Sequence, residues 1–183
     1  MNTVLLANLI KIRWIAILGQ LITLFTIYFV FNFMIPLTEC LMVVLLSVLV
    51  NFSSYFIQKG NSTLTDKKTF LFLLFDISQL VGLIFLTGGV FNPFVVLIIA
   101  PIIISASYLS ALWTILLSLY SIVLILIINS NYISLNWEKE FITPSLYNIG
   151  ILVALIITIV FLALYAYLFA SSARKISSAL KAA

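Results

Sequence analysis

Residues 69–94 read TFLFLLFDISQLVGLIFLTGGVFNPF, an apolar run with one acidic side chain that stops at a pair of glycines. The part from 69 to 87 has about the ~20 apolar residues that an α-helix needs to cross the ~30 Å hydrocarbon core of a bilayer. This stretch therefore predicts a membrane-spanning helix that ends at Gly88 and Gly89.

The composition of the whole chain agrees with residence in a membrane. Hydrophobic residues make up 64% of the 183, and only nine basic and five acidic residues are present. An ordinary soluble domain has roughly a quarter of its residues charged, so a water-soluble fold is excluded. We predict an all-α membrane protein with six transmembrane helices. The uncharged residues 105–110 leave open a single helix with a re-entrant segment in place of spans four and five. The six expected spans are 14–34, 36–57, 69–87, 94–108, 111–128 and 146–170.

Basic residues predict how these helices are oriented, because loops rich in Lys and Arg stay cytoplasmic. With the N-terminus inside, eight of the nine basic residues fall on the cytoplasmic side and only Lys139 falls outside. We therefore expect both termini in the cytoplasm, and we read the net charge of +4 as orientation, with no nucleic-acid partner. The external loops are too short to hold a folded sensor domain. The eight residues are Lys11, Arg13, Lys59, Lys67, Lys68, Arg174, Lys175 and Lys181.

Two features of the composition exclude several kinds of chemistry. The chain has no histidine, which removes histidine metal sites, histidine-dependent nucleophiles and a phosphohistidine. Cys40 is the single cysteine, so no disulfide can form within one chain. We therefore expect no metal site and no thiol redox chemistry within one chain.

The segment 88–94 is the first candidate site. Two glycines end a helix and let a ligand or a neighbouring helix approach the backbone, and Asn92-Pro93 starts a turn that can open the next helix. A plain tight turn is the alternative, because Gly-Gly and Asn-Pro are common in turns.

Asp76, Gln79 and Gln20 are polar residues that we expect inside the membrane. Asp76 and Gln79 lie three residues apart on one helical face, and Asp76 is ~12 Å into the core. An ionised carboxylate is costly there, so we expect Asp76 to be protonated and bonded to Gln79 or to a neighbouring helix. Gln20 is a candidate partner between helices, and Gly19 beside it would allow close packing. A purely structural role is the alternative for all three polar side chains.

The last residues predict a rigid connection into the cytoplasm. Small and apolar residues recur at 169, 173, 176, 180 and 183, a 4-3-4-3 spacing typical of a two-stranded coiled coil. We therefore divide the chain into a transmembrane sensor domain, 1–170, and the start of a coiled-coil linker, 171–183. The alternative is a simple helix with a solvated basic face.

These motifs together resemble the RegB/PrrB family of redox-responsive sensor histidine kinases. The resemblance implies a six-helix, multi-pass domain of the bacterial inner membrane that senses the ubiquinone pool and controls autophosphorylation of a cytoplasmic histidine. It also implies a homodimer, cytoplasmic kinase domains and a response regulator as partners in two-component signal transduction. The motifs are GGxxNPF at 88–94, RWxAxxGQ at 13–20, DxxQ at 76–79 and ARKISxAL at 173–180.

The same resemblance implies a quinone site near the outer end of the third helix. A quinone ring can stack on an aromatic side chain, and its carbonyls accept hydrogen bonds from an amide or from backbone N–H groups at glycines. Asp76, Gln79 and Gln20 are the supporting polar residues. The expected quinone-binding residues are Gly88, Gly89, Phe91, Asn92, Pro93 and Phe94.

The chain also departs from that family. Without a histidine or a Gly-rich ATP lid it is not expected to be an enzyme by itself, and we expect a membrane-domain fragment or a truncated paralogue. A competing hypothesis is a substrate-binding six-helix membrane subunit of a vitamin-type transporter, which would co-purify with ATPase partners. A third is a membrane scaffold in which Asp76 and Asn92 are only packing residues.

Overall fold

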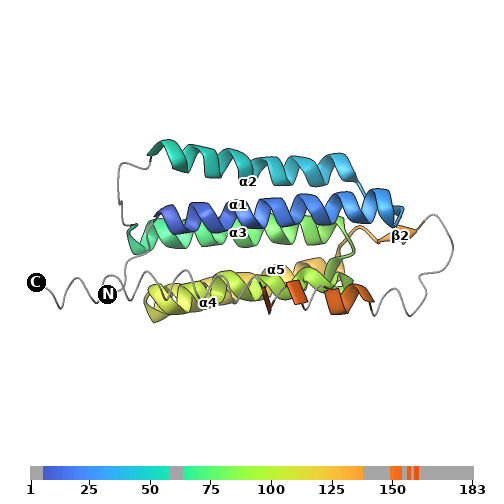
Figure 1. Cartoon of the computed structure of the whole chain (residues 1–183). Coiled ribbons are helices and arrows are strands. Elements are labelled where there is room, and N and C mark those ends of the chain that lie inside the picture. Colours follow the sequence, from blue (N-terminus) through green and yellow to red (C-terminus); the bar gives the residue numbers. More distant parts are fainter. Residues whose placement is uncertain (1–5, 58–63, 138–148, 154–155, 158, 161–183) are drawn as a thin grey trace, which may run out of the picture.

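The computed structural model describes residues 6–57, 64–137, 149–153, 156–157 and 159–160. Five α-helices with nearly parallel axes form a bundle in this part of the chain (Figure 1). Two short strands pair antiparallel at one end of the bundle, with Phe33 opposite Trp137. The elements are α1 (Leu6–Phe25), β1 (Phe33–Met34), α2 (Leu37–Ile57), α3 (Asp66–Leu86), α4 (Ile99–Tyr108), α5 (Ala111–Ser130) and β2 (Asn136–Trp137).

Two of the helices are extended by tighter or wider turns. A π-helical turn, Thr26–Val30, continues α1. Two 3-10 segments, Gly89–Phe91 and Pro93–Ile98, lead from α3 into α4.

The helical membrane-type fold expected from the composition is confirmed in its coarse form. Pro93–Tyr108 is a shorter apolar helix beside the longer ones. Most of the expected span 146–170 and the whole tail 171–183 lie outside the described residues, so six spans and two cytoplasmic termini stay predictions. Within the described residues, four helices are long and apolar enough to cross a membrane, namely Leu6–Val30, Leu37–Phe56, Asp66–Leu86 and Ala111–Ser130.

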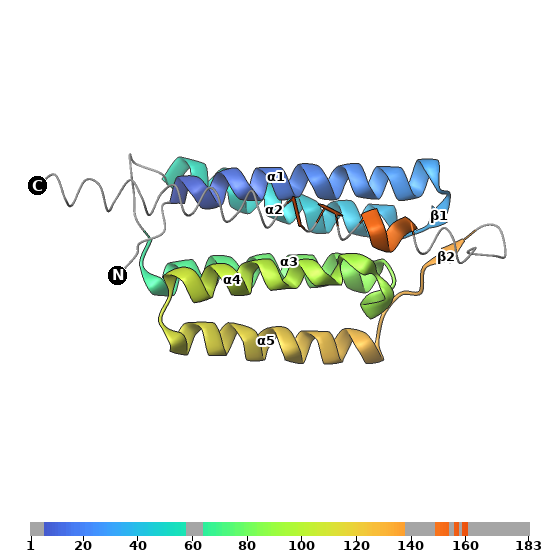
Figure 2. The ribbon, with the colours of Figure 1, turned by 60° about the horizontal axis from the view of Figure 1, so that its bottom comes forward.

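The fourth and fifth expected spans are separate helices. Leu109 and Ser110 have extended backbone, with ψ of 166° and 158°, and they break the helical hydrogen bonding between α4 and α5. The two helices lie side by side in Figure 2. Pro93–Tyr108 is shorter than the helices long enough to span, so the choice between two full spans and one span with a re-entrant segment stays a prediction.

α3 is the central helix of the described bundle, with α1 and α2 on one side of it and α4 and α5 on the other (Figures 1 and 2). Leu73, Ile77 and Ile84 are almost fully buried in the larger apolar core, which also takes in Leu117 of α5. Large apolar side chains are exposed along α1, α2 and α5, as a lipid-facing surface requires.

Three small polar side chains are buried on α2. Ser47, Asn51 and Ser54 are buried at 0–3% exposure. The Asn51 Nδ2 group donates a hydrogen bond to the Ile10 carbonyl of α1 at 3.0 Å. Small residues let helix backbones approach in lipid, where hydrophobicity alone gives no reason for helices to associate.

Candidate functional site

The chain turns sharply where α3 ends, at the paired glycines. Gly88 has a φ of 107° and Gly89 a φ of 60°, in the left-handed region that glycine enters without strain. The Gly88 N–H donates to the Ile133 carbonyl at 3.0 Å, and the Ile133 N–H donates to the Phe85 carbonyl at 2.9 Å. These two backbone bonds hold the segment after α5 against the end of α3.

Tyr132 packs directly onto Gly89. A β-carbon added at Gly89 would lie 2.5 Å from Cγ of the tyrosine and 2.7 Å from its Cβ. No side chain fits there, so Gly89 is needed for the close approach of the ring as well as for its backbone angle. The space beside the second glycine is thus filled by the protein itself.

The side chain of Asn92 holds the turn together. Its Oδ1 atom accepts a hydrogen bond from the Phe94 N–H at 2.9 Å. Its Nδ2 group donates to the Thr87 carbonyl at 3.1 Å and to the Thr87 hydroxyl at 2.7 Å. Pro93 opens the following 3-10 segment, where its missing N–H costs no hydrogen bond. Asn92 therefore positions the turn through both ends of its amide.

An exposed aromatic pair marks the surface of this corner. The Phe91 side chain is 63% exposed and Tyr132 is 37% exposed. Their ring centroids are 5.8 Å apart with the planes at 59°, whereas Phe94 is half-buried. In the corner formed by 88–94, the two glycines are thus buried and the Phe91–Tyr132 pair lies at the surface.

A buried ion pair joins α1 to α3 within the bundle. Arg13 Nε donates to Asp76 Oδ1 at 2.8 Å, and Arg13 Nη2 donates to Asp76 Oδ2 at 3.1 Å. The arginine side chain is 5% exposed and the aspartate 27%. The guanidinium carbon also lies 5.1 Å from the centroid of Phe72 and 5.9 Å from that of Phe75. This two-pronged geometry is the strong form of a charged hydrogen bond.

A second polar contact between the same helices lies farther along their length. Gln20 Nε2 donates to Gln79 Oε1 at 3.1 Å, and Gln79 Nε2 donates back to Gln20 Oε1 at 2.9 Å. The pair satisfies two amides that would otherwise be unpaired inside the membrane. Gln20 is therefore a partner between helices, as expected, and its partner is Gln79.

Asp76 is bonded to a neighbouring helix, which is one of its two expected partners, because it lies against Arg13 of α1 and not against Gln79. Two other expectations were wrong. We expected the first span to begin at 14 and to leave Arg13 in a cytoplasmic segment, yet α1 begins at Leu6 and carries Arg13 into the bundle. A β-carbon at Gly19 would meet nothing within 4 Å, so this glycine does not serve close packing. Arg13 and Gln20 are seven residues apart, about two helical turns, so they lie on one face of α1. This spacing in the sequence indicates that both side chains can meet the same neighbouring helix.

The two places differ in the side chains that they present. Within the described part of the chain, no three of its cysteine and acidic residues come together as a metal site. The glycine corner presents two partly exposed aromatic rings, and the interior of the bundle has two polar contacts that join α1 to α3.

Comparison with known proteins identifies relatives of the whole membrane region. A sensor histidine kinase RegB from Cereibacter sphaeroides is 35% identical over 179 residues, which is 97% of this chain and 39% of the relative. A RegB from one strain of the same species is 35% identical over 75 residues, which is 41% of this chain and 16% of that relative. No protein-family model matches the chain, and no solved structure matches it.

The chain spans well under half of the length of these relatives. The similarity nevertheless runs through α1, α3 and the glycine turn, because it covers 97% of the residues. The expected resemblance to the RegB/PrrB family of sensor histidine kinases is thus confirmed over 97% of this chain, which matches 39% of such a kinase.

Proposed function

We propose that this chain is the membrane sensor domain of a redox-responsive histidine kinase, and that it binds a quinone near the outer end of α3. The single observation that carries the proposal is the 35% identity to sensor histidine kinase RegB over 97% of the chain. The kinase domains, the response regulator and the homodimer belong to the proposal, as do six spans with both termini in the cytoplasm of a bacterial inner membrane.

The Phe91–Tyr132 pair is the proposed contact for the quinone ring. Both rings are partly exposed at the corner made by Gly88 and Gly89, and a flat aromatic ligand gains by stacking on such side chains. A quinone dissolves in lipid, so it reaches this corner without an extracellular domain.

Asn92 has a different part in the proposal from the one first expected. Its amide donates to Thr87, so it orients the turn rather than offering a free donor to a quinone carbonyl. Pro93 and Phe94 continue the same turn into the 3-10 segment. Asp76, Gln79 and Gln20 support the site by fixing α1 against the helix that ends there.

Sensing requires that the two redox forms of the quinone bind unequally. An oxidised quinone accepts hydrogen bonds through its carbonyls, whereas the reduced form also donates through hydroxyls. Each tenfold preference for one form supplies ~1.4 kcal/mol to shift the helix arrangement, and a site without preference shifts nothing. The shift would pass through the sixth expected helix into the linker at 171–183.

A binding experiment tests the quinone site. The purified chain in lipid nanodiscs is titrated with a short-chain ubiquinone, and the Phe91→Ala variant is compared with Phe29→Ala. Phe29 is a matched control, because it is 64% exposed against 63% for Phe91 and it lies in the turn that ends α1. We expect Phe91→Ala to weaken binding by about tenfold through lost stacking and Phe29→Ala to leave it unchanged. Equal effects of the two variants, or binding that never saturates, would contradict the site.

A further inference from the structure

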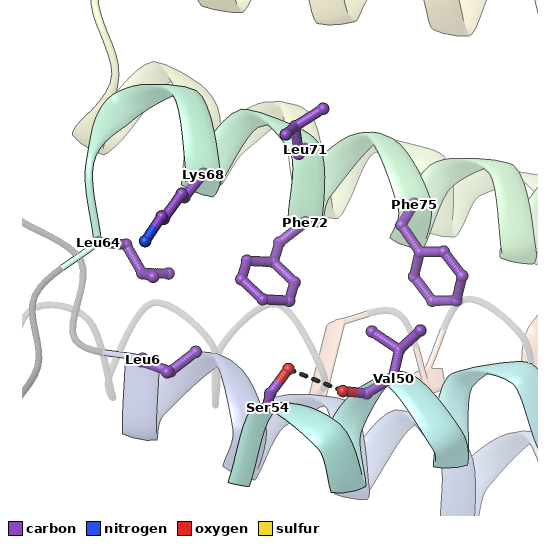
Figure 3. A pocket seen from close by; sticks show the side chains of 8 residues that line it. All are labelled: Leu6, Val50, Ser54, Leu64, Lys68, Leu71, Phe72 and Phe75. Carbon is purple, nitrogen blue, oxygen red and sulfur yellow. Dashed lines mark hydrogen bonds between the residues drawn. The ribbon is translucent and has the colours of Figure 1, made fainter. Parts of the chain in front are cut away.

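A separate groove lies at the other end of α3, where this helix begins. It has a volume of about 390 Å³ and almost wholly apolar walls. This size is within the ~300–1,000 Å³ of typical ligand sites. Figure 3 shows Phe72 and Phe75 of α3 facing Ser54 and Val50 of α2 across it. The lining residues are Leu6, Val50, Ser54, Leu64, Lys68, Leu71, Phe72 and Phe75.

One positive charge lies at an end of this apolar groove. The amino group of Lys68 is beside Leu64 and on the same side of the groove as Leu6 (Figure 3). The Lys68 side chain is exposed. Within the described residues, Arg13 forms an ion pair with Asp76, and Lys68 takes no part in that pair. The charge pattern of the sequence predicts that this end of α3 lies at the cytoplasmic boundary of the membrane.

The hydroxyl of Ser54 adds little polarity to the walls. It donates to the Val50 carbonyl of its own helix at 2.7 Å, so its proton is already used. A ligand in the groove would therefore meet apolar surface along its length and a single ammonium group at its end.

We propose that this groove binds an anionic phospholipid, with an acyl chain against Phe72 and Phe75 and the phosphate at Lys68. An apolar groove in a membrane-spanning chain is in contact with acyl chains, and a lysine near the cytoplasmic leaflet attracts anionic headgroups by ~1 kcal/mol. Charge complementarity selects the headgroup, and the apolar walls select a chain over a soluble phosphate. The inference is independent of the quinone proposal, whose site lies at the opposite end of α3.

The groove is connected to the ion pair inside the bundle. Phe72 and Phe75 line the groove, and the same two rings contact the Arg13 guanidinium. An acyl chain lying on these rings would hold them against Arg13 and so favour the Arg13–Asp76 pair. The lipid would thus act on the contact that fixes α1 to α3.

Native mass spectrometry of the purified chain tests the headgroup. The protein is exchanged into micelles with equal amounts of phosphatidylglycerol and phosphatidylethanolamine of the same acyl chains, and the retained lipids are counted. We expect phosphatidylglycerol to be retained in preference, and Lys68→Gln to lower its retention by about fivefold. Lys67→Gln is the control, because it removes the same charge from the next residue, which does not line the groove.

A second pair of variants tests the apolar walls. Val50→Phe fills the groove, so it should reduce retention of both lipids, whereas Leu49→Phe places the same ring on an exposed position outside it. Thermal unfolding and circular dichroism of each variant show that the bundle is intact. Equal losses for Lys68→Gln and Lys67→Gln would mean general surface attraction and would overturn the proposal. So would unchanged lipid retention in Val50→Phe, the result expected if a second copy or another segment of this chain occupies the groove.

Discussion

Gly89 is the residue where the turn tolerates least change, because the Tyr132 ring lies where a β-carbon would be. Gly89→Ala would combine a side chain at a φ of 60° with a 2.5 Å contact to that ring. We expect it to lower the free energy of unfolding by about 2–4 kcal/mol. Thermal unfolding of the purified variant in detergent measures the change.

Gly19→Ala is the matched control for that variant. Gly19 lies inside α1, and a β-carbon there would meet nothing within 4 Å. Alanine is the better helix former, so stability should stay equal or rise by up to ~1 kcal/mol. A loss as large as that of Gly89→Ala would show that the Tyr132 contact is not what makes Gly89 sensitive.

At the same scale, the motif 88–94 was recognisable from the sequence but the use of its residues was not. Gly-Gly followed by Asn-Pro predicts a helix end and a turn, and both are found. The sequence does not indicate that Thr87 accepts hydrogen bonds from Asn92. Nor does it indicate that Tyr132 packs on Gly89, because that contact depends on where the chain returns after α5. Whether a quinone contacts these residues stays a prediction.

At the scale of the helices, the Arg13–Asp76 pair is the contact that a single substitution disturbs most. Asp76→Asn would leave the buried guanidinium without its counter-charge, and such a loss costs about 3–5 kcal/mol. Gln20→Leu removes only an uncharged contact, which is worth about 0.6–1.7 kcal/mol between membrane helices. Chemical unfolding in mixed micelles should therefore rank Asp76→Asn well below Gln20→Leu in stability.

A double variant shows whether the charge itself is responsible. Arg13→Met combined with Asp76→Leu removes both charges and replaces them by apolar side chains, which is often close to neutral for a buried pair. We expect the double variant to be more stable than Asp76→Asn alone. If it is less stable, the ion pair contributes more than the cost of an unpaired charge.

The helices themselves were predictable, and their pairing was not. Long apolar runs predict α1, α2, α3 and α5 because length and composition suffice for a span. Those runs are apolar on every side, so the sequence carries little information on which face meets which neighbour. The exceptions are isolated polar side chains, and which of them pair depends on how α1 and α3 are aligned along their axes. Arg13 lies in the bundle and not in the expected loop because α1 begins at Leu6.

At the scale of the whole molecule, the proposed output is a dimeric rod beyond the membrane. The 4-3-4-3 pattern predicts that Ala173 faces its copy in the partner, whereas Ser178 points away. In a Cys40→Ala background, oxidation of membranes should therefore cross-link an Ala173→Cys variant much more than Ser178→Cys. Gel electrophoresis without reductant measures the dimer fraction, and equal cross-linking of both variants would exclude the coiled coil.

The two polar contacts between α1 and α3 have a mechanical consequence for any signal that starts at the glycine turn. Arg13–Asp76 and Gln20–Gln79 lie at two levels along the same pair of helices. Sliding α3 past α1 by one helical turn, ~5.4 Å, would break both contacts together. A displacement of α3 along its axis would therefore take α1 with it, so that the first and third helices would shift as one rigid unit relative to the other helices.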